Sequence, residues 1–173
     1  MTLNYNFSCR IILRMKLKKI KTIVSGGQTG ADRAAFDFAL ENGIEIGGFV
    51  PKGRRAEDGK ISANYPNLIE TVTRNYMERT ELNVQNSDAT LIVSHDRLTS
   101  GSLLTKKFAE KHQKPFLHID LLKLTIEESA EKARKWLILI KCKTLNIAGS
   151  RASTDAEIYE KTKRFLAALF FAN

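Results

Sequence analysis

Short apolar runs alternate with longer segments of helical period along most of this chain. The apolar runs predict strands at residues 20–25, 44–50, 89–94, 116–119 and 145–148. Between them, apolar positions recur at spacings of three, four and seven residues, which predicts helices that each turn one stripe toward a core. Parallel strands need crossover connections of this length. The pattern therefore predicts a three-layer α/β fold around a mainly parallel sheet of about five strands.

The predicted helices occupy residues 31–42, 73–86, 102–111, 126–140 and 158–169. Two of them begin with a capping-box sequence, in which a threonine side chain and a glutamate three residues later satisfy free backbone amides. These pairs are Thr125 with Glu128 and Thr154 with Glu157. By contrast, residues 51–72 have little regular pattern, and a segment that long without one usually has a function in a compact domain.

Length and charge limit the classes of protein that fit. The 173 residues suit one domain, which we place at residues 15–173, because residues 1–14 have neither a strand nor a helical period. We expect residues 1–14 to be a disordered tail or upstream codons counted as protein. The net charge of +9 is concentrated at the start: residues 1–21 hold six basic and no acidic side chains, and the remainder holds 22 basic and 19 acidic ones. The chain beyond residue 21 therefore has a net charge of only +3, which argues against a specific nucleic-acid partner.

Hydropathy and cysteine spacing narrow the classes further. The chain has no run of eighteen apolar residues, so we expect no membrane-spanning helix and no membrane partner. Cys9 and Cys142 are far apart and lack any zinc-ligand spacing, which argues against a metal site and against a disulfide framework. A reducing, cytoplasmic location is the resulting expectation.

Candidate binding residues follow the first predicted strand in the segment SGGQTGAD, residues 25–32. Glycines at such a strand–helix junction let the backbone approach a ligand closely, and the free amides at the helix start favour phosphate. The candidates in this segment are Gly26, Gly27, Thr29, Gly30 and Asp32. A tight turn in which Thr29 or Asp32 caps the helix is the alternative interpretation.

Two further strand–helix junctions carry residues that suit an anion. Gly101, Ser102 and Thr105 follow the third predicted strand, and their hydroxyls suit either phosphate binding or helix capping. Ser150 and Arg151 follow the last predicted strand, where a guanidinium suits a bidentate phosphate contact. Because ligands of open parallel sheets bind beyond the carboxyl ends of the strands, we expect the three junctions to converge on one ligand.

The irregular segment adds basic and acidic side chains near the same edge. Lys52, Arg54 and Arg55 suit either a lid over an acidic ligand or a solvated surface loop. Asp32 and Glu57 are the candidates for acid–base catalysis, and a carboxylate in such a loop suits helix capping equally well. The chain offers no Ser-His-Asp or Cys-His set for nucleophilic catalysis.

Other polar residues fall near this edge as well. One face of a predicted helix carries polar residues at spacings of three and four, namely Tyr76, Arg79 and Asn83. This face is directed either toward the ligand or toward solvent. His95 follows a predicted strand, and a lone histidine of this kind usually has a structural role.

The segments that carry these candidates resemble a known family. They read IVSGGQTGADRAAFDFAL, GGFVPKGRRAEDG, YMERTELNV, SDATLIV, TSGSLLTKKFAEKHQKPF and LNIAGSRAS. In this order they are similar to the proposed molybdenum cofactor carriers, also described as circularly permuted YpsA-like proteins of the SLOG superfamily. The resemblance runs from about residue 19 to the C-terminus. In ordinary relatives a Gly-Ser-Arg strand end comes first in the chain, whereas here residues 149–151 come last.

The resemblance implies a Rossmann-like fold, a phosphate-bearing nucleotide or pterin ligand, and often a homo-oligomer. The first expectation for function is accordingly a carrier that binds molybdopterin, the molybdenum cofactor, as cargo. By the same match, the ligand contacts are Gly26, Gly27, Thr29, Gly30, Asp32, Gly101, Ser102, Thr105, Ser150 and Arg151.

The resemblance also implies an alternative, a nucleotide-processing enzyme of the LOG type. Such an enzyme cleaves the N-glycosidic bond of nucleoside monophosphates, and Asp32 or Glu57 would assist the attacking water. LOG enzymes use a PGGxGTxxE segment, and residues 99–105 have no glutamate in register, which favours binding over hydrolysis. Single-stranded DNA binding, found among DNA-processing relatives, is disfavoured by the near-neutral body and the lack of an aromatic row.

Overall fold

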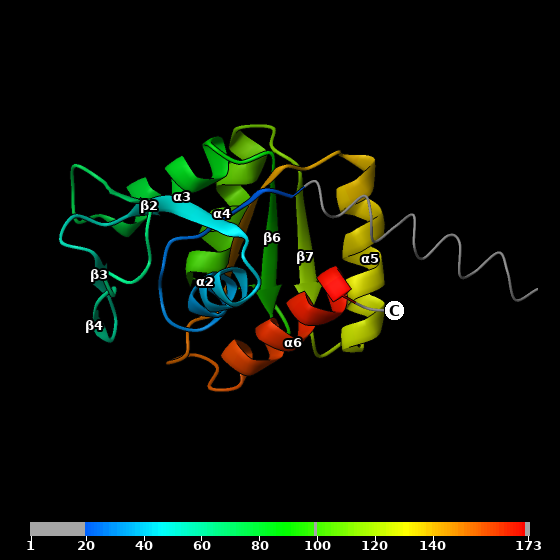
Figure 1. Ribbon diagram of the computed structural model, residues 1–173. Helices are drawn as coiled ribbons and strands as arrows, with labels where there is room; N and C mark the ends of the chain where they lie inside the picture. The colour runs from blue at the N-terminus through cyan, green and yellow to red at the C-terminus, as the bar shows by residue number, and fades with distance from the viewer. Residues whose placement is uncertain (1–19, 99, 172–173) are drawn as a thin grey trace, which may run out of the picture.

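The computed structural model describes residues 20–98 and 100–171, so the expectation for residues 1–14 lies outside it. Within these residues, six parallel strands form one sheet in the order β5-β2-β1-β8-β6-β7 (Figure 1). The strands are β1 (Thr22–Val24), β2 (Glu45–Val50), β5 (Leu68–Glu70), β6 (Ala89–Ser94), β7 (Phe116–Asp120) and β8 (Thr144–Gly149). The α/β fold class is confirmed, with one strand more than the sequence predicted.

The additional strand, β5, lies inside the segment of residues 51–72. It is three residues long and pairs with the outer side of β2, where Ile69 aligns with Phe49. Two of its three residues are exposed. So short an edge strand leaves no alternation of apolar and polar positions in the sequence, which explains why the pattern missed it.

The last strand, β8, lies in the middle of the sheet between β1 and β6. Leu145 aligns with Ile23 of β1 on one side and with Ala89 of β6 on the other, and all three side chains are buried. The strand–helix junction at the end of the chain therefore lies beside the junction at its start. This is the arrangement that a circular permutation produces.

Helices cover both faces of the sheet and complete three layers. α2 (Ala31–Glu41), α5 (Ile126–Leu139) and α6 (Ile158–Phe171) pack together on one face. α3 (Tyr76–Gln85) and α4 (Ser100–Lys111) pack together on the other (Figure 1). The core between the layers is apolar, and its fully buried large side chains include Phe36, Leu91, Ile147 and Phe165.

One of the two predicted capping boxes is present. The Thr125 hydroxyl accepts from the Glu128 amide at 3.2 Å, and the Glu128 carboxylate accepts from the Thr125 amide at 2.9 Å. The other prediction was wrong, because α6 begins at Ile158 and Thr154 lies too far upstream to cap it. The Thr154 amide donates instead to the Arg151 carbonyl, in a turn that precedes the helix.

A two-stranded antiparallel hairpin, separate from the six-stranded sheet, follows β2. Its strands are β3 (Arg55–Ala56) and β4 (Gly59–Lys60) (Figure 1). The hairpin and β5 together account for the segment in which the sequence showed no period. None of the helices in the described part of the chain combines the length and apolar character needed to cross a bilayer.

Candidate functional site

The first and last strand–helix junctions are in direct contact at the carboxyl edge of the sheet. Gly30 has a φ of 76°, and a Cβ there would lie 2.4 Å from the carbonyl oxygen of Ser150. The Ala31 amide donates to that same oxygen at 3.1 Å, and the Ala152 amide donates to the Thr29 hydroxyl at 3.2 Å. Only a glycine at position 30 permits this close approach, because any side chain would separate the two loops.

Two adjoining cavities open at this edge. The larger has a volume of about 180 Å³ and the smaller about 100 Å³. The larger is lined by Gln28, Asp32, Tyr76, Arg79, Thr80, Gly101, Leu104, Thr105, Ala148, Gly149 and Arg151. The smaller is lined by Gly101, Ser102, Gly149, Ser150, Arg151, Ser153 and Thr154. Arg151 lines both cavities, and four segments remote in the sequence, residues 28–32, 76–80, 101–105 and 148–154, meet around them.

A buried ion pair forms one wall of the larger cavity. Arg79 Nη1 lies 3.3 Å from Asp32 Oδ2, and this oxygen also accepts a hydrogen bond from the backbone amide of Gln28 at 3.3 Å. Burial raises the pKa of the Asp32 carboxyl above its ordinary value of 3.8, although the Arg79 guanidinium opposes the rise. The guanidinium fills the space above Gly26, where a Cβ would lie 1.5 Å from Nη1. Gly26 thus shapes the site by admitting Arg79.

Tyr76 brings the two arginines of the cavity together. Its ring centroid lies 6.0 Å from the Arg79 guanidinium carbon and 5.5 Å from that of Arg151. Arg79 and Tyr76 thus point toward the ligand cavity, one of the two alternatives that their helical spacing allowed. Among the described residues, the Arg151 guanidinium has this aromatic contact and no hydrogen bond or ion pair. It is therefore available to an anion.

Gln28 lines the cavity, and the sequence analysis did not select it. Its Oε1 atom accepts from the amides of Thr29 at 3.1 Å and Glu57 at 2.8 Å. The side chain is 3% exposed, and its Nε2 atom has no hydrogen-bond partner. A buried donor of this kind signals a missing acceptor. The residue stood inside the quoted glycine-rich segment, but only the folded chain reveals that it is buried and half-satisfied.

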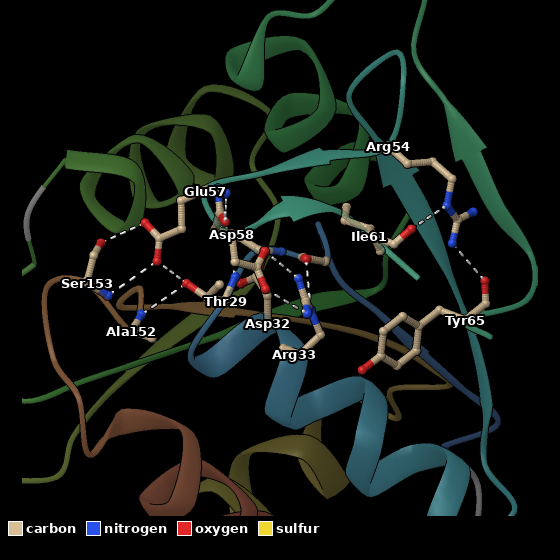
Figure 2. A network of polar contacts seen from close by, with 12 residues as sticks. Thr29, Asp32, Arg33, Arg54, Glu57, Asp58, Ile61, Tyr65, Ala152 and Ser153 are labelled. Atoms are coloured by element: carbon tan, nitrogen blue, oxygen red, sulfur yellow. Dashed lines mark hydrogen bonds and ion pairs between the residues drawn. The ribbon is translucent and has the colours of Figure 1, made fainter. Parts of the chain in front are cut away.

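The two acidic residues at the tip of the hairpin attach it to the site: Glu57 binds both loops and Asp58 binds α2 (Figure 2). The Glu57 carboxylate accepts from the Thr29 hydroxyl and from the amide and hydroxyl of Ser153, at 3.2 and 2.6 Å. Asp58 forms a bidentate pair with Arg33 at 3.1 and 3.2 Å. Partial burial acts to raise the pKa of Glu57, but the hydrogen bonds from Ser153 and Thr29 outweigh it and hold the pKa below 4.5. Glu57 thus links the loop after β1 to the loop after β8.

The three basic residues of this segment that the sequence singled out lie differently from the acidic ones. The Arg54 guanidinium donates to the carbonyls of Ile61 at 3.1 Å, Ser62 at 2.5 Å and Tyr65 at 3.1 Å, and Figure 2 shows it directed away from Thr29 and Ser153. Lys52 and Arg55 are exposed and do not line either cavity. The segment approaches the edge through its acidic tip rather than through these cations.

Of the remaining predicted site residues, four line a cavity and one does not. Gly101 and Thr105 line the larger cavity, with the Thr105 hydroxyl donating to the Gly101 carbonyl at 3.0 Å. Ser102 and Ser150 line the smaller one. Gly27 lines neither, and a Cβ there would lie 2.9 Å from Ile61.

Two further polar residues have structural partners. The Asn83 side chain accepts from the Phe49 amide at 2.7 Å and donates to the Phe49 carbonyl at 3.0 Å, which attaches α3 to β2. His95 Nδ1 lies 2.6 Å from Asp155 Oδ2 and joins the end of β6 to the loop before α6. Within residues 20–98 and 100–171, no group of three or more histidine, cysteine or acidic side chains suits a metal ion.

Comparisons with known proteins agree with this architecture. A solved structure named as a proposed molybdenum carrier protein, from Syntrophus aciditrophicus SB, is 51% identical, with a TM-score of 0.86. The alignment covers 89% of this chain and 96% of that one. A second structure, (E)-4-hydroxy-3-methyl-but-2-enyl diphosphate reductase, aligns over 95% of this chain and 66% of that one. At 14% identity and a TM-score of 0.35, it supports no inference.

A search of curated proteins found no match. Residues 23–170 match the sequence model of the circularly permutated YpsA SLOG family. That match extends over most of the chain and includes every loop of the site described above. The central position of the last strand agrees with the permutation in the family's description. The chain belongs to the circularly permuted YpsA family of SLOG proteins.

Proposed function

We propose that this protein binds a phosphorylated heterocycle, such as the molybdenum cofactor, at the carboxyl edge of its sheet and holds it as cargo. The observation that carries the proposal is the position of Arg151. Its guanidinium lines both cavities and has no direct hydrogen bond or ion pair to any described residue, and the Asp32 and Glu57 carboxylates attract it from a longer distance. A cation held in this state provides charge-assisted, bidentate contacts for phosphate oxygens.

The smaller cavity suits the phosphate. Hydroxyl side chains of Ser102, Ser150 and Thr154 line it beside Arg151, and the first turn of α4 lies at its wall. Free amides and the positive dipole end of a helix start attract an anion. The larger cavity suits the remainder of the molecule, because it combines the Tyr76 ring and Leu104 with polar groups.

The name of the relative supports the identity of the cargo. A protein that is 51% identical over most of both chains is named as a proposed molybdenum carrier. Molybdopterin has a phosphate on one side and a polar heterocycle on the other, which matches the two-part hollow. The expected homo-oligomer and the cytoplasmic location stay predictions, to be measured by light scattering and by cell fractionation.

Substitution of Arg151 with alanine tests the proposal. We expect the affinity for molybdopterin or for guanosine 5′-monophosphate, measured by titration calorimetry, to fall by about 1.5–3 kcal/mol, or roughly 10- to 150-fold. Arg55→Ala is the matched control, because it removes an exposed cation that lines neither cavity. An unchanged affinity in Arg151→Ala, or equal losses in both variants, would eliminate the assigned role of Arg151.

One observation favours the alternative, N-glycosidase activity. Asp32 lines the larger cavity, and burial raises the pKa of its carboxyl above 3.8, the direction expected of a carboxyl group that acts in acid–base catalysis. Glu57 is less suited, because its oxygens accept hydrogen bonds from Thr29 and Ser153. If the protein is an enzyme, it will release ribose 5-phosphate from a nucleoside monophosphate, and Asp32→Asn will abolish release while binding persists. A carrier binds the nucleotide and releases none.

A further inference from the structure

The orientation of the Gln28 side chain is set by two backbone amides. Both the Thr29 and the Glu57 amides donate to its Oε1 atom. The amide group cannot turn over without bringing two donors against its own NH₂ group. The Nε2 end is consequently held in one place, and it is the end that finds no acceptor in the described structure.

Asp32 lines the same cavity as this unpaired donor. The Gln28 backbone amide donates to Asp32 Oδ2, which also accepts from Arg79 Nη1, so the two residues are joined by a hydrogen bond in the cavity lining. The other carboxylate oxygen, Oδ1, has no hydrogen bond to any residue that the structure describes. The lining thus offers a buried side-chain donor without a partner, Gln28 Nε2, and a carboxylate oxygen, Asp32 Oδ1, on two residues whose positions other contacts fix.

We propose that Gln28 and Asp32 form a subsite for the hydrogen-bonding edge of a heterocycle. Gln28 Nε2 donates to a ring carbonyl or ring nitrogen, and Asp32 Oδ1 accepts from an adjacent ring N–H or amino group. This proposal rests on the proposed function and adds to it, because it separates recognition of the ring from recognition of the phosphate by Arg151. A buried donor is costly without an acceptor, so the ring compensates a deficit that is already present.

The variant Gln28→Glu tests the subsite, and urea unfolding first verifies that it folds, because the change adds a carboxylate to the buried lining that holds Asp32. A glutamate keeps one oxygen for the Thr29 and Glu57 amides and replaces the Nε2 donor with an acceptor. The probes are guanosine 5′-monophosphate and molybdopterin, which present N–H donors beside a carbonyl, together with ribose 5-phosphate, which has no ring base. Gln85→Glu is the control, because it adds the same charge at an exposed position on α3.

We expect the ratio of guanosine 5′-monophosphate affinity to ribose 5-phosphate affinity to fall about tenfold or more in Gln28→Glu, and not in Gln85→Glu. Molybdopterin should lose affinity to a similar degree. An unchanged ratio overturns the subsite, and so does an equal loss for all three probes. In either case wild-type binding still supports the carrier function. If wild-type protein binds none of the probes, the proposed function fails and the subsite fails with it.

Discussion

Replacing Arg79 with methionine should lower the free energy of unfolding by about 3–5 kcal/mol at pH 7. Methionine preserves much of the side chain's volume but leaves the buried Asp32 carboxylate without its hydrogen-bonded countercharge, and only the longer-range attraction of Arg151 remains. The two side chains are only 11% and 5% exposed, so water compensates little of the loss. Urea unfolding measures the change. The double variant Arg79→Met with Asp32→Asn is the control, and it should regain most of the loss, because no buried charge then remains.

The loss of stability in Arg79→Met should be larger at neutral pH than at acidic pH. The folded-state pKa of Asp32 is already raised by burial, so its charged form destabilises the folded chain as pH rises through that value. Removing Arg79 raises this pKa further. The deficit of Arg79→Met relative to wild type should therefore be largest near pH 7 and shrink toward pH 4, where Asp32 takes up a proton. A deficit of equal size at both pH values would contradict the ion-pair account.

Gly30→Ala should destabilise the fold by about 2–6 kcal/mol. Part of this cost, about 1–3 kcal/mol, comes from the positive φ of 76° at this position. The rest, again about 1–3 kcal/mol, comes from the clash of the new Cβ with the Ser150 carbonyl, 2.4 Å away. The variant should also lose ligand affinity, since the loop that carries Arg151 must move.

A matched variant separates the two costs. Gly43 also has a positive φ, of 65°, but no atom lies within 4 Å of a Cβ built there. Gly43→Ala should therefore cost only the backbone strain, about 1–2 kcal/mol, and leave ligand affinity unchanged. Equal losses of stability in the two variants, measured by urea unfolding, would show that the contact between the two loops contributes nothing.

The sequence was sufficient to predict the fold class, because the spacing of apolar residues shows which face of a long helix or strand is buried. It failed where a short element makes few contacts, as with the three residues of β5. It also placed the start of the helix before β6 too early, at residue 73. Asn75 caps α3 by accepting from the Met77 amide at 2.9 Å, and Thr73 binds Glu78 instead of continuing the helix.

The convergence of the junctions was predictable, whereas the partners of individual side chains were not. Parallel strands bring their carboxyl ends to one edge whatever the loops contain, so Asp32, Gly101 and Arg151 could be grouped from topology alone. The carbonyls that accept from Arg54 lie 7 to 11 residues further along an irregular segment, and one of the two amides that orient Gln28 belongs to Glu57, 29 residues away. Neither charge nor composition in the sequence reports such contacts.

Hydrogen–deuterium exchange tests the central claim most directly, with guanosine 5′-monophosphate and molybdopterin as ligands. If these remote segments bind one phosphorylated molecule, then the backbone amides of residues 26–32, 100–105 and 149–154 will all exchange more slowly when the ligand is present. The Arg151→Ala variant will show much less of this protection at the same ligand concentration. Protection confined to one of these segments or to another face, or equal protection in wild type and Arg151→Ala, would contradict the account.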